Sequence, residues 1–168
     1  MIPKESKIPQ NRLVKNSILK SNQKILIGVL VFFTIIFVDH FSKLWILTNY
    51  QTKSLHIMPF LDFVFVQNRG VAFGLFANTS LNFTLISIVS IGLISYLLYK
   101  FLKSPSPILI AMILAGALGN IWDRLIFGYV IDFVKVDSFY VFNVADSSIT
   151  LSAIWIILLI LYENRKTV

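Results

Sequence analysis

The stretch that decides the fold runs from Leu114 to Ile149 and contains LAGALGNIWDR (114–124), GYVIDF (128–133) and FNVADSSI (142–149). Within 27 residues of an otherwise apolar chain it gathers four aspartates, two asparagines and one arginine: Asn120, Asp123, Arg124, Asp132, Asp137, Asn143 and Asp146. Charges beside or within a membrane are costly and are retained mainly where they serve a function. We therefore expect the chemistry of the chain here, with helix capping as the structural alternative.

The composition defines the class of protein. Hydrophobic residues make up 57% of the chain, charged residues 14%, and the mean hydropathy is +0.79, so we expect a membrane protein. The absence of cysteine excludes disulfides and thiolate metal sites, and neither His40 nor His56 lies in a zinc-hydrolase motif. We expect no metal or other cofactor. The net charge of +7 is dispersed along the chain, which argues against a nucleic-acid partner.

Apolar runs predict four transmembrane helices, at about 25–48, 81–102, 105–127 and 146–162. The fold class is thus an all-α membrane protein. Residues 1–24 are basic, carry Pro3 and Pro9, and predict a flexible cytoplasmic tail, and residues 25–166 predict a single membrane domain. The segments at about 49–80 and 128–145 are polar excursions, with strands expected at 61–67, 129–136 and 139–142.

The distribution of charge predicts the orientation. Of the fifteen basic residues, six lie in the tail, two in the loop after the second predicted helix and two after the fourth, whereas all six aspartates fall on the other side. Because basic residues accumulate on the cytoplasmic side, both termini should be cytoplasmic. The aspartates should then lie near the extracytoplasmic surface.

Two groups of polar residues share helix faces. Asp39 and Lys43 stand at i and i+4, which fits a self-neutralising pair as well as a site. Asn120, Asp123 and Arg124 stand at i, i+3 and i+4, where an Asp123–Arg124 charge pair is the structural alternative. The small residues at 115–119 before them form a surface that a second helix can approach closely.

Two further aspartates lie in apolar surroundings. Asp132 interrupts a strand-like run, and Asp146 precedes two serines at the start of the last helix, where N-capping is the plainer explanation. Two carboxylates brought close together cannot both ionise, so one holds a proton while the other activates water, as in aspartic proteases. A transporter and a purely structural assembly factor are the alternatives, although no internal repeat supports a transporter.

Five blocks, in order along the chain, resemble the family of lipoprotein signal peptidases, also called signal peptidase II. They are Asp39-x-x-Ser42-Lys43, Asn68-x-Gly70-x-Ala72-Phe73-Gly74, Gly116-Ala-Leu-Gly-Asn120-x-x-Asp123-Arg124, Val130-x-Asp132-Phe133 and Phe142-Asn143-x-Ala145-Asp146-Ser147.

The resemblance implies an aspartic endopeptidase of the bacterial inner membrane that removes the signal peptide from diacylglyceryl-modified prolipoproteins, just before the lipidated cysteine. It implies Asp132 and Asp146 as the catalytic pair. Residues that bind substrate or brace the site would be Asp39, Lys43, Asn68, Gly70, Asn120, Asp123, Arg124, Asn143 and Ala145. The polar segments would form a small extracytoplasmic β platform and a surface helix, and the partners would be the lipid-modified prolipoprotein and membrane lipid.

Overall fold

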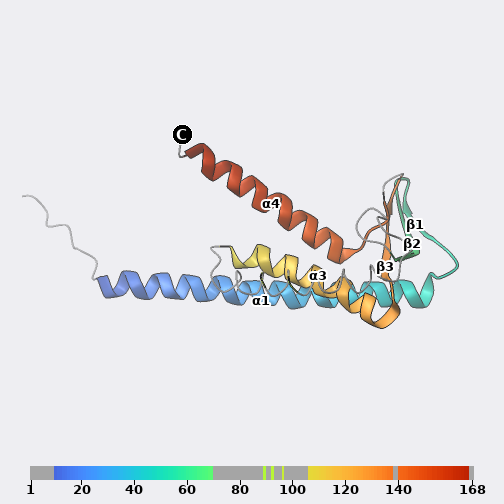
Figure 1. The fold of residues 1–168 in the computed structure, drawn as a ribbon, viewed down its shortest axis with the longest axis horizontal. Coiled ribbons are helices and arrows are strands. Elements are labelled where there is room, and N and C mark those ends of the chain that lie inside the picture. The colour runs from blue at the N-terminus through green and yellow to red at the C-terminus, as the bar shows by residue number, and fades with distance from the viewer. Residues whose placement is uncertain are drawn as a thin grey trace, which may run out of the picture.

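A computed structural model describes residues 10–69, 89, 92, 96, 106–137 and 140–166 of the chain. Three long helices and a small sheet make up the described part: α1 (Gln10–Asn49), β1 (Leu55–Met58), β2 (Leu61–Asn68), α3 (Pro107–Phe127), β3 (Val130–Val136) and α4 (Val144–Lys166). In Figure 1, α1 and α3 lie side by side, the sheet stands at their C-terminal ends, and α4 leaves the sheet at an angle to the other two helices. The polar segments therefore gather at one end of the helices.

Helix α1 begins earlier than the sequence predicted. It starts at Gln10 rather than near residue 25, so that residues 10–24 are helical and not irregular. Pro9 directly precedes the first turn, and neither proline nor glycine follows until Gly28, so nothing in residues 10–24 stops a helix from extending out of the apolar segment. At about 1.5 Å per residue the helix is roughly 60 Å long, about twice the hydrocarbon thickness of a bilayer.

Two described helices are long and apolar enough to cross a membrane, α1 over Ile18–Asn49 and α3, and α4 contains a shorter apolar helix over Val144–Leu159. Helix α3 has Pro107 at its first position and ends at Gly128, whose φ of 78° and bond to Arg124 O terminate it. Of the predicted span at 81–102 the structure describes only residues 89, 92 and 96, which are helical, and the predicted surface helix before it lies outside the described residues. The arrangement of four spans therefore stays a prediction.

The sheet is antiparallel with β2 in the centre. Strands β2 and β3 confirm the predictions at 61–67 and 129–136, whereas β1 was not predicted. Of the strand predicted at 139–142, residue 142 forms only an isolated bridge with Val134. Asn68 pairs with Val130 in the register of β2 and β3. Asp132 is two residues beyond Val130 on the same face, so Asn68 and Asp132 are diagonal neighbours.

Glycines on α3 allow the helices to approach closely, as the small-residue surface predicted. A methyl group on Gly116 would overlap Ala145 O and lie 2.5 Å from Ser148 Oγ of α4. A methyl group on Gly119 would lie only 2.7 Å from Asp39 Oδ2 of α1. Helix α3 is thus packed on both neighbours where their polar residues lie.

Candidate active site

A cluster of buried charges lies between α1 and α3. Lys43 Nζ lies 2.7 Å from Asp39 Oδ2 and 3.0 Å from Asp123 Oδ2, and it donates a 3.1 Å hydrogen bond to Asn120 Oδ1. Lys43, Asp39 and Asp123 are each 2% exposed. The expected i, i+4 pair of Asp39 and Lys43 is therefore present, and it has gained a second carboxylate from α3.

Each carboxylate of this cluster also holds a backbone group of a neighbouring element. Asp39 Oδ1 accepts from Ala145 N at 2.8 Å, which fastens the first turn of α4 to α1. Asp123 Oδ2 accepts from Ile131 N at 3.1 Å, which fastens β3 to α3. The salt bridge of Asp123 in the described structure is with Lys43, so the Asp123–Arg124 pair considered from spacing is not the arrangement found.

Asp132 lies on β3, buried at 2% exposure, and both of its oxygens accept amide hydrogens. Asn143 Nδ2 donates to Oδ1 at 2.7 Å and Asn68 Nδ2 donates to Oδ2 at 2.8 Å. Burial, and next the negative charge of Asp146, raise the pKa of Asp132 to about 7, although the two amide donors act in the opposite direction. Asp132 thus holds a proton at a pH where an exposed aspartate is ionised.

Asp146 is half-buried in the first turn of α4, where the helix begins with a reciprocal cap. Asn143 Oδ1 accepts from Asp146 N at 2.8 Å, and Asp146 Oδ2 accepts from Asn143 N at 3.4 Å. The N-cap residue is therefore Asn143, and Asp146 is the returning partner. Its other oxygen, Oδ1, accepts from Asn120 Nδ2 at 2.7 Å.

Two asparagine amides join the two aspartates. Asn143 Nδ2 donates to Asp132 Oδ1 and also lies 3.1 Å from Asn120 Oδ1, and Asn120 Nδ2 donates to Asp146. Lys43 can only donate, so it requires the oxygen of Asn120 to face it and the amide nitrogen to face Asp146. Lys43 thus sets the orientation of the Asn120 amide, through which the two aspartates are joined.

Ten of the eleven predicted site residues lie in the described structure, and Gly70 lies outside it. Nine of them are linked by the hydrogen bonds and ion pairs above, from Asp39 on α1 to Asp146 on α4. Arg124 is half-buried one turn beyond Asn120, donates to Asn120 O at 3.4 Å and is within electrostatic range of Asp146 and Asp132. Gly119 belongs to the small-residue surface predicted on α3, but the sequence did not identify Asp39 as the side chain for which it makes room.

Comparisons with known proteins agree on one family. The family model of signal peptidase (SPase) II matches residues 31–162. A lipoprotein signal peptidase of Thermodesulfovibrio yellowstonii is 36% identical over 140 residues, covering 80% of this chain and 91% of the relative. One of Syntrophomonas wolfei is 34% identical over 141 residues, covering 80% and 93%. One of Shewanella baltica is 38% identical over 143 residues, covering 78% and 81%.

Two solved structures of bacterial membrane enzymes, obtained by the in meso method, have the same fold. The structure at 2.3 Å resolution gives a TM-score of 0.76 at 30% identity, covering 82% of this chain and 88% of that one. The structure at 1.9 Å resolution gives 0.71 at 31% identity, covering 80% and 92%. The family model spans most of this chain, and the matches to the first two relatives cover nearly their whole length. This membrane protein therefore belongs to the signal peptidase II family of lipoprotein signal peptidases.

Proposed function

We propose that the chain is an aspartic endopeptidase in which Asp132 and Asp146 act as one acid–base pair. The observation that carries the proposal is the chain of amide donors that joins the two carboxylates, from Asp132 through Asn143 and Asn120 to Asp146. It holds both side chains in fixed orientations while leaving Asp146 half-buried. Fixed orientation with access to water is what a pair that shares one proton requires.

The two environments support one assignment of the roles. Asp132, with its pKa raised to about 7, carries the proton and hydrogen-bonds to the oxygen of the scissile carbonyl. Asp146 accepts two N–H donors and lies at the N-terminal end of α4, where the helix dipole stabilises negative charge. Asp146 is therefore the base that takes a proton from water as the water oxygen attacks the carbonyl carbon.

As the water attacks, Asp132 passes its proton to the carbonyl oxygen, and the tetrahedral intermediate then collapses. The C–N bond breaks, the proton taken up by Asp146 passes to the leaving nitrogen, and Asp132 regains its proton as the new carboxyl group forms. The reaction consumes one water and returns both aspartates to their starting states. The half-buried Arg124, close to both carboxylates, limits the accumulation of negative charge at the site.

The substrate that we propose is a prolipoprotein carrying a diacylglyceryl group, cleaved just before the modified cysteine. Its support is membership of the family and the position of Asp132 on β3 and Asp146 at the start of α4, at the end of the helices where the sheet lies (Figure 1). The diacylglyceryl chains would stay in the bilayer while the peptide bond reaches Asp132 and Asp146. We therefore expect membrane lipid to surround the enzyme and also to hold the acyl chains of the substrate during cleavage.

The test uses purified protein and a diacylglyceryl-modified prolipoprotein, with release of the signal peptide followed by mass spectrometry. Asp132→Asn and Asp146→Asn should each lower the rate by roughly 10² to 10⁴ or more. The double variant should be little worse than either single one, because the two residues act as a unit. The mature product should begin with the lipidated cysteine.

Asp137→Asn is the matched control. Asp137 follows β3 in the same segment, with a φ of 45° that asparagine also tolerates, and it should keep nearly normal activity. Each variant is checked for folding by its thermal midpoint, since Asn at position 132 offers only one acceptor to two amide donors. An active, folded Asp146→Asn enzyme, or an inactive Asp137→Asn enzyme, would show that the pair has been assigned wrongly.

We propose that both termini lie in the cytoplasm and that the sheet lies on the extracytoplasmic side of the bacterial inner membrane. A cysteine introduced at Thr52, exposed just before β1, should react with a membrane-impermeant thiol reagent in intact spheroplasts. A cysteine at Ser6 should react only after lysis. The reverse pattern would require the opposite orientation of the chain.

A further inference from the structure

A pocket of about 370 Å³ lies between α1 and α3 and is separate from the proposed catalytic pair. The described residues that line it are Ile36, Asp39, His40, Leu118, Gly119, Trp122 and Asp123. Neither Asp132 nor Asp146 is among them. The pocket therefore touches the buried ion cluster from a side that the proposed reaction does not use.

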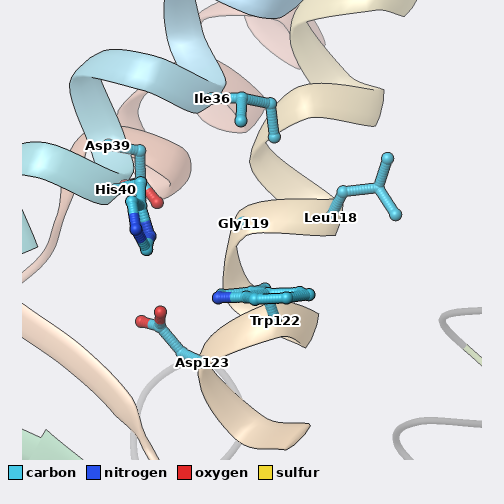
Figure 2. A pocket seen from close by; sticks show the side chains of 7 residues that line it. All are labelled: Ile36, Asp39, His40, Leu118, Gly119, Trp122 and Asp123. Atoms are coloured by element: carbon cyan, nitrogen blue, oxygen red, sulfur yellow. The ribbon is translucent and has the colours of Figure 1, made fainter. Parts of the chain in front are cut away.

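The lining is ordered from apolar to polar along the helices. Both α1 and α3 run toward the sheet, and Ile36 and Leu118 lie one turn farther from the sheet than His40 and Trp122 (Figure 2). One turn is about 5.4 Å. The pocket thus has an apolar end toward the middle of the membrane and a polar end toward the surface that carries the sheet. A membrane lipid has the same order.

The polar end has hydrogen-bonding capacity that the described structure does not use. Asp123 Oδ2 serves Lys43 and Ile131, but within the described residues Asp123 Oδ1, the His40 ring nitrogens and the indole N–H of Trp122 make no hydrogen bond. Figure 2 shows the His40 ring, the Asp123 carboxylate and the nitrogen of the Trp122 indole turned toward one open space. Two potential N–H donors and one carboxylate oxygen therefore face a shared ligand position.

The charge beside this space selects the ligand. Asp39 and Asp123 with Lys43 carry a formal charge of −1 in total, and these three side chains are almost fully buried. A cationic group that donates hydrogen bonds would balance that charge at Asp123. An anionic group can bind only on the side of His40 and Trp122, where N–H donors are present.

We propose that this pocket binds an aminophospholipid, a lipid whose headgroup combines a primary ammonium with a phosphate. The ammonium donates to Asp123 Oδ1, the phosphate accepts from His40 and Trp122, and the start of an acyl chain packs on Ile36 and Leu118. A choline headgroup has the charge but no N–H donor, and a glycerol headgroup lacks the cation. The occupant touches Asp123 directly, so binding should also stabilise the Lys43 cluster. The proposal does not depend on the catalytic roles of Asp132 and Asp146.

The experiment uses the full chain in lipid-free detergent with Trp45→Phe and Trp155→Phe, which leave Trp122 as the only tryptophan of three. Short-chain phosphatidylethanolamine, phosphatidylcholine and phosphatidylglycerol are titrated while Trp122 emission and the thermal midpoint are followed. We expect saturable binding that is about tenfold tighter for phosphatidylethanolamine, the difference of roughly one hydrogen bond to a charged group. We also expect its thermal midpoint to rise most with that lipid.

The matched variants are His40→Leu and His56→Leu. His40→Leu should weaken phosphatidylethanolamine binding about tenfold. His56→Leu should leave binding unchanged, because His56 is exposed on β1 and pairs with Asp62 at 2.7 Å. Equal affinity for the three lipids, no saturable change with any of them, or an unchanged His40→Leu protein would each overturn the proposal. Displacement of the lipid by a prolipoprotein substrate would also overturn it, because the pocket would then belong to the active site. The comparison of the three lipids requires no substitution in the pocket, so it still tests the proposal if His40→Leu fails to fold.

Discussion

Replacing Lys43 with methionine tests the organisation of the whole site with one substitution. Methionine keeps most of the length of the side chain and removes the ammonium group with its charge. Asp39 and Asp123, each 2% exposed, would then face each other without the cation that lies 2.7 and 3.0 Å from them. Removing one partner of a buried ion pair costs about 3 to 5 kcal/mol, because the remaining charge stays buried without compensation.

The same substitution should slow the reaction in a protein that is still folded. Asn120 Oδ1 would lose the Lys43 donor and keep only Asn143, so its amide would be held toward Asp146 less firmly. A hydrogen bond to a charged group contributes about 1.5 to 3 kcal/mol, which corresponds to roughly 10- to 150-fold in rate. The charge of Lys43 lowers the pKa of Asp132. Removing that charge should therefore also shift the alkaline limit of the pH profile of cleavage.

The assay combines thermal unfolding in detergent with cleavage of a lipidated peptide. Lys43→Met should lower the midpoint and the turnover, and adding Asp39→Asn should recover part of the stability by removing one uncompensated charge. Lys53→Met is the control, because Lys53 is exposed and its ammonium lies 5.4 Å from the ring centre of Tyr50. A Lys43→Met enzyme with the midpoint, turnover and pH profile of the wild type would refute the reasoning.

Two further predictions follow from close contacts and from burial. Gly119→Ala places a methyl group 2.7 Å from Asp39 Oδ2, so it should cost about 1 to 3 kcal/mol and reduce turnover, whereas Gly92→Ala, with nothing within 4 Å, should change neither the midpoint nor the rate. The pKa of Asp132 is raised from 3.8 to about 7 in the folded protein. Its protonated form therefore contributes stability that is fully present below pH 4 and is lost as the pH rises through 7. The loss amounts to about 4 kcal/mol at most. The midpoint of the wild type should therefore fall between pH 4 and 8, and Asp132→Asn should remove most of that slope; cleavage should decline above pH 7 as Asp132 loses its proton. A flat wild-type midpoint would contradict the raised pKa.

Local spacing predicted those parts of the site that lie within one helix. Asp39 and Lys43 form the pair expected at i and i+4, and Asn120 and Asp123, on the face expected for i and i+3, both contact Lys43. The partner of Asp123 could not be read from spacing, because Lys43 belongs to another helix and approaches only through close packing. Spacing alone had favoured Arg124.

The pairing of Asp132 and Asp146 was suggested by their apolar surroundings and by the family resemblance, and not by any periodicity. Their connection depends on the register of the sheet and on the cap of α4, both of which are tertiary features. The early start of α1 was missed for a local reason, since polarity was taken as irregular structure although residues 10–24 contain no helix breaker. The capping explanation for Asp146 was half right. The cap exists, but Asn143 is its first residue.

The i, i+4 spacing of Asp39 and Lys43 also bears on how the chain is made. Asp39 receives its backbone donor from Ala145, 106 residues later, and Lys43 receives Asp123 from a helix that is synthesised well after α1. During translation, two isolated charges would each oppose the entry of α1 into the bilayer by about 2.5 to 3.5 kcal/mol. Paired on successive turns, they can neutralise each other from the start. Because α4 follows the other described elements along the chain, the nascent chain can hold its charges in the membrane before Asp146 is made, and Asp132 gains Asp146 as a neighbour only after α4 has been synthesised.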